Sequence, residues 1–372
     1  MPQQAQCHFG RRSSAAPRGN HYRTLAESPW VFRETSPFGF GENPIAAAFV
    51  GARSEFIVPG VNGASGSIFH PQSAEAHAIA HLFTITLIIC AVIFAVVLGL
   101  VVYSLVRFRG REGEADPEQI AGNKKVEIVW TIIPMIIVGV LFALTVQAMQ
   151  VSDPPLETKP DLVVIGHQWW WEIRYPNTGI VTANEIHIPV GKQLSIRLDT
   201  ADVLHEFWVP QLTRKMTTVP LLGNHVWMEA RKSGVYEGVC SEFCGTQHAW
   251  MRFQVVAEPQ EQYDAWVRNQ QRKAPETATV AAARRGWRLF NDMTCVNCHA
   301  IQGTPARGTA GPDLTHLASR RTLGSVIVPN TPENLRRWLA DPQQVKPGVK
   351  MPNFKLTDEQ VSDLVEYLGS LK

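Results

Sequence analysis

One short stretch of the chain, Cys240–Met251, holds two thiols, an imidazole and a thioether. These groups belong to Cys240, Cys244, His248 and Met251. Thiolate and thioether ligands together with imidazole select copper, zinc or iron–sulfur chemistry. Zinc rarely takes a thioether ligand, and a second imidazole is available upstream at His205. The stretch is therefore predicted to bind a soft metal centre, with a local disulfide and a structural zinc site as the alternatives.

A second group of reactive side chains follows in the sequence Cys295-Val-Asn-Cys298-His299. This is the c-type haem attachment motif, in which two thiols form thioethers with the haem and the adjacent imidazole reaches the iron. Taken alone, the motif also fits a zinc knuckle or a redox dithiol. Amphipathic runs at 281–290 and 357–371 flank it, which favours a small helical haem domain.

Composition limits what else the chain does. It has 372 residues, enough for two or three domains, and its net charge of +2 implies neither a nucleic-acid partner nor an acidic substrate. Charged residues make up 18% of the chain and mean hydropathy is near zero, which together suggest a membrane segment joined to soluble domains. Residues 1–75 are rich in Gly, Pro, Ser and Ala, and they are predicted to be disordered or removed by processing, unless the start codon is misplaced.

Two apolar runs, His81–Val106 and Val126–Met149, are each long enough to cross a hydrocarbon core of ~30 Å. Basic residues crowd both ends of the short loop between them, at Arg107, Arg109, Arg111, Lys124 and Lys125. The positive-inside rule therefore predicts a two-pass hairpin whose loop is cytoplasmic and whose two ends lie outside.

Residues 161–257 alternate short β-rich runs with turn residues, which predicts an all-β sandwich or barrel. Within it, Gly166-His-Gln-Trp-Trp-Trp-Glu-Ile stands out. On a strand, Trp169 and Trp171 would share one face and Trp170 the other. The plain interpretation of these aromatics is packing in the core or at the membrane surface. Residues 258–278 are polar and are interpreted as a linker with some helical character.

The order of these metal-binding groups closely resembles the binuclear copper (CuA) site of cytochrome c oxidase subunit II. The resemblance implies a cupredoxin-like barrel holding two copper ions through two bridging thiolates, two imidazoles, a weak thioether and a backbone carbonyl. In that order, the ligands are Cys240 and Cys244, His205 and His248, Met251, and Glu242. The family also implies that electrons enter near Trp169.

The resemblance extends to the membrane hairpin and to the end of the chain. In the family, a glutamate at the position of Glu127 lies at the mouth of a proton pathway into subunit I; a first-turn acid that favours the helix dipole is the other interpretation. The C-terminal region resembles a class I cytochrome c. This implies that Met351 is the second axial ligand and that the Pro312 carbonyl supports His299. Met293 and His316 are rival axial candidates.

Three further side chains of this region have two interpretations each. Arg320, Arg321 and Trp338 are candidates to hydrogen-bond haem propionates. The alternative is a solvated basic face for the two arginines and core packing for the tryptophan.

The predicted organisation is therefore multidomain. It comprises an extension at 1–75, a transmembrane hairpin at 76–150, a cupredoxin-like copper domain at 151–258, a linker at 259–278 and an all-α cytochrome c domain at 279–372. This order resembles subunit II of the caa-type oxidases, in which the electron donor is fused to the subunit that accepts from it.

That resemblance implies an oxidoreductase and proton translocase. Its subunit II passes electrons from its own haem c to CuA and on to subunit I, where O₂ is reduced to water with proton pumping. The implied cofactors are two copper ions and one covalent haem c. The implied partners are subunits I and III and an external donor, either cytochrome c or a bc complex. The implied location is the bacterial inner membrane, with the copper and haem domains on the periplasmic side.

Three alternatives remain open at this stage. The first is the electron-entry subunit of a CuA-type nitric-oxide reductase. The second is a membrane-anchored electron carrier or copper-delivery protein without a catalytic partner. A quinol oxidase subunit II would share the anchor and barrel but lack the copper ligands, which are present here.

Overall fold

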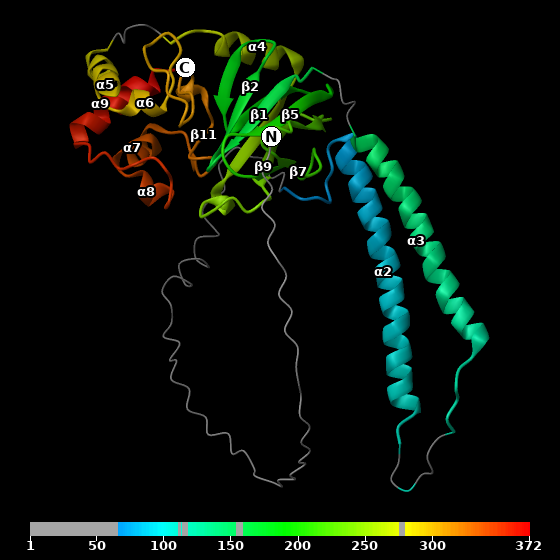
Figure 1. The fold of residues 1–372 in the computed structure, drawn as a ribbon. Coiled ribbons are helices and arrows are strands. Elements are labelled where there is room, and N and C mark those ends of the chain that lie inside the picture. The colour runs from blue at the N-terminus through cyan, green and yellow to red at the C-terminus, as the bar shows by residue number, and fades with distance from the viewer. Residues whose placement is uncertain (1–65, 111–112, 114–117, 154–158, 275–279) are drawn as a thin grey trace, which may run out of the picture. The chain divides into compact units, whose positions relative to one another are not determined.

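The computed structural model describes residues 66–110, 113, 118–153, 159–274 and 280–372 (Figure 1). The predicted extension at 1–75 lies mostly outside these ranges. The description begins with a short segment leading into the first long helix, and it contains two apolar helices, a β domain and a C-terminal helical domain.

The two long helices are α2 (Ala74–Arg107) and α3 (Lys124–Ser152), which run beside each other as a hairpin. At about 1.5 Å per residue they measure roughly 50 and 44 Å, longer than a bilayer core of ~30 Å. Ser73 and Asn123 cap their first turns through side-chain oxygens. Their apolar side chains are exposed on all sides in the isolated chain, as expected of helices whose surroundings are lipid or other membrane helices.

The hairpin joins the β domain through a small polar cluster. The Arg214 guanidinium donates to the Ser152 carbonyl at 2.9 Å and pairs with Asp153 at 2.6 Å. The Ser73 hydroxyl donates to the Leu212 carbonyl at 2.7 Å. These bonds connect both ends of the hairpin to the β domain, through the Ser152 carbonyl at one end and the Ser73 hydroxyl at the other.

The β domain is a sandwich of two five-stranded sheets, with strand orders β3-β2-β1-β5-β8 and β4-β10-β9-β6-β7. Its strands are β1 (Leu162–His167), β2 (Trp170–Tyr175), β3 (Ile180–Ala183), β4 (Glu185–Pro189), β5 (Leu194–Thr200), β6 (His205–Trp208), β7 (Met216–Thr218), β8 (Asn224–Met228), β9 (Gly234–Cys240) and β10 (Arg252–Glu258). The core lies between the sheets, where Trp171, Phe207 and Phe253 are buried against one another, with ring centroids 4.6–5.7 Å apart.

This topology brings distant metal-binding residues together. β9 and β10 pair antiparallel, so the stretch between them is a hairpin connection, closed by a bond from the Cys240 amide to the Met251 carbonyl at 3.1 Å. β6 pairs with β9 in the register Phe207 to Cys240, which places His205, at the start of β6, beside the same connection.

The segment predicted as a linker contains an ordered helix, α4 (Gln260–Gln270). Trp266 of this helix stacks on the His187 ring at 4.3 Å, and Val267 packs on the core of the sandwich. The first half of the predicted linker therefore belongs structurally to the β domain.

The C-terminal domain consists of helices around a second apolar core. They are α5 (Ala281–Asp292), α6 (Cys295–Cys298), α7 (Pro332–Ala340), α8 (Pro342–Val345) and α9 (Asp358–Gly369), with a short β11 (Thr322–Leu323) and β12 (Val328–Pro329) pair. α5 crosses α9 closely at Gly286, which has no Cβ. A Cβ at this position would clash with the Asp363 carbonyl. This crossing holds α6 in place at the end of α5.

Candidate copper and haem sites

All six groups predicted to bind copper lie together. The Cys240 sulfur is 3.8 Å from the Cys244 sulfur, 3.9 Å from His205 Nδ1 and 3.2 Å from the Glu242 carbonyl oxygen. The Cys244 sulfur is 3.8 Å from both His248 Nδ1 and Met251 Sδ. A disulfide requires sulfurs at about 2.05 Å, so Cys240 and Cys244 are two free thiols.

The donor set suits soft metal ions. Two thiolates, two imidazoles, a thioether and a carbonyl exceed what one tetrahedral zinc takes, and sulfur donors favour copper. The hydrogen bond with Cys244 lowers the pKa of the Cys240 thiol to about 4 in the metal-free chain. The pKa of Cys244 is raised in turn, chiefly because it is the donor in that bond. Metal cations would replace the shared proton and hold both sulfurs as thiolates.

Residues outside the ligand set hold the His205 ring in place. Its Nε2 is 2.9 Å from the Asp202 carboxylate, which leaves Nδ1 directed at the Cys240 sulfur. Such an outer partner fixes the tautomer and orientation of a metal-binding imidazole. Gly166 faces the same ring, and a Cβ there would lie 2.5 Å from His205 Cδ2. Sequence reasoning missed both residues, although Asp202 lies only three positions before His205.

The tryptophan predicted to admit electrons contacts this loop, but not from a strand. Trp169 lies in the turn between β1 and β2, so the expected sharing of a strand face with Trp171 is wrong. Its indole N–H donates to the Cys244 carbonyl at 3.0 Å, beside the Gln168 amide, which donates to the same oxygen at 2.8 Å. Gly245, at φ +118°, lets the loop approach the indole ring to within van der Waals contact.

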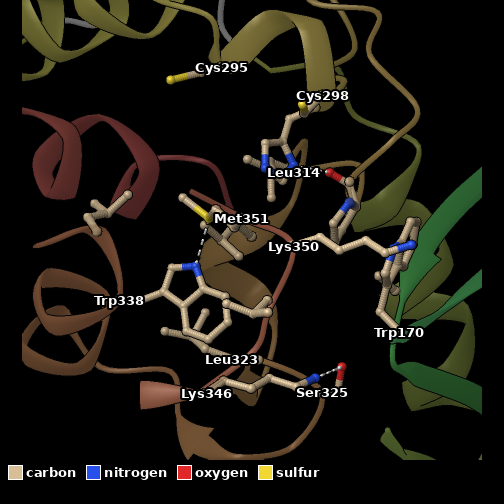
Figure 2. A pocket seen from close by; sticks show the side chains of 18 of the residues that line it. Trp170, Cys295, Cys298, Leu314, Leu323, Ser325, Trp338, Lys346, Lys350 and Met351 are labelled. Atoms are coloured by element: carbon tan, nitrogen blue, oxygen red, sulfur yellow. Dashed lines mark hydrogen bonds between the residues drawn. The ribbon is translucent and has the colours of Figure 1, made fainter. Parts of the chain in front are cut away.

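The C-terminal domain has a largely apolar cavity lined by the haem-attachment motif (Figure 2). Figure 2 shows Cys295 and Cys298 on one side of it and Met351 facing them, and His299 also belongs to the lining. Two residues of the β domain, Trp169 and Trp170, also line this cavity.

The residues of this cavity fit a haem with histidine and methionine ligands. His299 Nδ1 donates to the Pro312 carbonyl at 2.8 Å, so Nε2 is left to bind iron. Burial lowers the pKa of His299, which favours the neutral imidazole that a metal needs. Met351 Sδ accepts a hydrogen bond from Trp338 Nε1 at 3.2 Å, which orients the thioether. Neither Met293 nor His316 lines the cavity, and His316 Nδ1 instead bonds the Lys372 carbonyl at 2.9 Å.

Three family models match separate parts of this chain. They describe the transmembrane domain of cytochrome c oxidase subunit II (residues 66–151), its periplasmic domain (179–258) and cytochrome c (283–372). Cytochrome c oxidase subunit 2 of Alkalihalophilus pseudofirmus is 36% identical over 311 residues, covering 81% of this chain and 90% of that protein. The chain belongs to the cytochrome c oxidase subunit II family.

Two further relatives are similar to this chain over shorter stretches. Cytochrome c oxidase subunit 2 of Bacillus sp. (strain PS3) is 35% identical over 286 residues, covering 71% of this chain and 80% of that protein. Quinol oxidase subunit 2 of Bacillus cereus is 32% identical over 217 residues, covering 56% of this chain and 75% of that protein. The predicted family and fold class are confirmed: this subunit II has two apolar helices, a cupredoxin-like sandwich and a C-terminal cytochrome c domain.

The predicted solvated basic face is correct for Arg321 and wrong for Arg320. Arg321 is exposed, but Arg320 is half-buried, lines the haem cavity and donates to the Asp313 carbonyl. Trp338 also lines the cavity, so both have access to a bound haem.

Glu127 lies in the first turn of α3 with its side chain exposed. The β domain follows the other end of this helix, so Glu127 is about 37 Å along the helix axis from Ser152. It therefore belongs to neither metal site, and any role it has concerns the opposite end of the membrane hairpin.

Proposed function

We propose that this subunit carries electrons from a haem c in its C-terminal domain to a CuA centre in its cupredoxin-like domain, and on to subunit I, where O₂ is reduced to water and protons are pumped. The observation that carries the proposal is the position of Trp169. Its ring lines the haem cavity while its indole N–H binds the carbonyl of Cys244, a proposed copper ligand, at 3.0 Å.

The proposed haem site uses four side chains. Cys295 and Cys298 would hold one haem covalently, and His299 and Met351 would be its axial ligands. Histidine–methionine ligation raises the reduction potential, which suits a donor to copper. The haem and the dicopper centre would each supply one-electron redox chemistry when bound. The chain itself would hold the axial ligands in position. His299 donates a hydrogen bond to the Pro312 carbonyl, and Met351 accepts one from Trp338.

The proposed copper site holds two ions through His205, Cys240, Cys244, His248 and Met251, with the Glu242 carbonyl. The connection between β9 and β10 is braced by its own backbone, including the amide of Cys240 on the Met251 carbonyl and that of His248 on the Gly245 carbonyl at 3.0 Å. A braced ligand loop changes little when its metal centre changes charge, which supports fast electron transfer.

Proposed partners follow from exposed surface as well as from the family. Phe243 is 76% exposed and packs on the proposed ligand His248, with ring centroids 5.8 Å apart. An exposed aromatic beside a redox centre suits a docking partner, which we propose is subunit I, with subunit III completing the core. An external cytochrome c or bc complex would reduce the haem domain.

The proposed orientation places both metal domains on the periplasmic side of a bacterial inner membrane. Basic residues flank the loop between α2 and α3, which the positive-inside rule keeps in the cytoplasm. Glu127 then lies at the cytoplasmic end of α3, where an acid is suited to load protons for subunit I. We propose domain limits at 76–150, 151–258, 259–278 and 279–372 for the hairpin, copper domain, linker and haem domain, with helix α4 of the linker packed on the copper domain.

The test is purification from the native membrane, followed by optical and EPR spectra and turnover with O₂ and with NO. A mixed-valence dicopper signal, a haem c band and a co-purified haem–copper subunit with cyanide-sensitive O₂ uptake are expected. Turnover on NO alone would make the partner a nitric-oxide reductase. A chain holding both metals without a partner would be an electron carrier, and the proposed oxidase role would be wrong.

A further inference from the structure

A buried lysine lies where the two metal domains meet. Lys346 is 2% exposed and lines the haem cavity near its lower edge in Figure 2. Its Nζ donates to the Trp169 carbonyl at 3.0 Å and contacts the Ser325 hydroxyl at 3.2 Å. No carboxylate among the described residues forms an ion pair with it, and burial lowers its pKa to about 7.

A cation in such a place is costly unless an anion accompanies it. A lysine ammonium has three N–H groups, and the two contacts of Lys346 are both to neutral oxygens. The rest of the cavity wall is largely apolar. An anion that comes with whatever fills the cavity would stabilise the charged form of Lys346, and haem carries two carboxylates. Arg320 is a second cation on the same wall, matching a ligand with more than one negative group.

Lys346 also reaches across the domain boundary. The Trp169 carbonyl that it binds belongs to the copper domain, and the Ser325 hydroxyl donates to the same oxygen at 3.1 Å. The indole of Trp169 in turn binds the Cys244 carbonyl. One residue of the copper domain thus connects the ammonium of Lys346 to the backbone of the copper loop.

Resting on the proposed haem site, we propose that Lys346 is the cationic partner of a haem carboxylate and ties that carboxylate to the copper domain through the Trp169 carbonyl. Lys346 is a binding and positioning residue in this arrangement. Its charge neutralises the carboxylate, whose negative charge otherwise favours ferric over ferrous haem. Removal of the lysine charge should therefore lower the haem reduction potential.

The test is spectroelectrochemistry of the full-length subunit in detergent, with haem c content measured independently as its pyridine haemochrome. Lys346→Gln keeps an N–H for the Trp169 carbonyl but loses the charge. The expected result is a roughly tenfold fall in the equilibrium constant for haem reduction, or about 59 mV for one electron. Lys346→Met, the second neutral variant, should shift the potential in the same direction, and Lys346→Arg should stay within twofold of the parent.

A matched control separates charge from domain contact. Glu185→Ala removes a different contact between the two domains and lies outside the cavity lining, so it should leave the haem potential within twofold. An unchanged potential in both neutral variants with full haem content would overturn the role of Lys346. So would an equal shift in Glu185→Ala, since the effect would then come from loosened domains. A parent chain without haem c would overturn the proposed function itself, and this inference with it.

Discussion

Glu185 forms a buried contact between the copper domain and the haem domain, and its removal should weaken their docking. The side chain is buried at the start of β4, and its Oε1 accepts the backbone N–H groups of Arg321 at 2.8 Å and Thr322 at 3.0 Å. Both donors belong to the haem domain. Glu185→Ala would leave these two N–H groups without their acceptor, the Arg321 one part-buried and the Thr322 one buried.

The expected loss can be bounded from these contacts. A buried donor left without its partner costs about 1–3 kcal/mol, so two such donors weaken docking by about 2 kcal/mol at the least. Every 1.4 kcal/mol is about tenfold, which makes the docked state roughly 30-fold less favoured. Glu185→Gln is the matched control, because an amide oxygen can accept the same two bonds without a buried charge.

The assay is hydrogen exchange on the haem-loaded subunit, followed at the peptide that contains Arg321 and Thr322. Exchange should rise about 30-fold in Glu185→Ala and stay near the parent level in Glu185→Gln. Burial raises the pKa of the Glu185 carboxyl. The native, docked form therefore binds its proton more tightly, so protection should be greatest below the ordinary pKa of about 4.5 and fall as the pH rises. Glu185→Gln should lack this pH dependence.

Two results would refute this reasoning. Equal exchange in the parent and in Glu185→Ala would mean that the two donors find water or another acceptor, so that docking does not depend on the carboxylate. A loss in Glu185→Gln as large as in Glu185→Ala would mean that the negative charge, and not the shared oxygen, holds the haem domain. In the first case the boundary would be held by the other contacts around Trp169.

Three further substitutions test other parts of the proposal. Asp202→Asn should weaken copper binding by about 10–100-fold, because the His205 ring loses its carboxylate partner; copper titration with EPR detection measures this, and unchanged affinity would contradict the supporting role. Trp169→Phe removes the N–H donated to the Cys244 carbonyl and should slow haem-to-copper electron transfer about tenfold or more in photoreduction experiments while the copper spectrum persists. Glu127→Gln should lower O₂ turnover of the complex severalfold without altering either metal spectrum, and full turnover with full proton release would leave Glu127 as a helix-end acid only.

The sequence predicted which candidate ligands lie together where they come from one short segment. Five of the six proposed copper donors lie in Cys240–Met251, and three of the proposed haem residues lie in one helical turn and the residue after it. Residue type and spacing alone define such sites, because the chain has little freedom to separate its ligands. His205 required the family resemblance, since its approach to Cys240 depends on how β6 pairs with β9.

Other features depend on packing that spacing does not encode. The turn at Gln168 and Trp169 has no Gly, Pro or Asn, so nothing in its composition separates it from the strands on either side. Helix α4 is polar apart from a narrow face around Trp266 and Val267, which explains why it resembled a linker. A buried lysine such as Lys346 is rarer still, because Lys is almost never fully buried unless paired.

One segment of the haem domain, directly before Met351, contacts the copper domain and so connects the two metal sites. Along Lys346–Met351, Lys346 binds the Trp169 carbonyl, Gly348 lies against Gln247 of the copper loop, and Lys350 Nζ contacts the Gln168 side chain at 3.0 Å. Gly348 has φ +87°, and a Cβ there would lie 3.2 Å from Gln247 Nε2, so this turn favours glycine twice over. The backbone that presents the haem thioether is thus the backbone that rests on the copper loop. The Glu185 contact lies outside this segment, at Arg321 and Thr322, so its loss should leave the contacts along Lys346–Met351, and with them the position of Met351, in place.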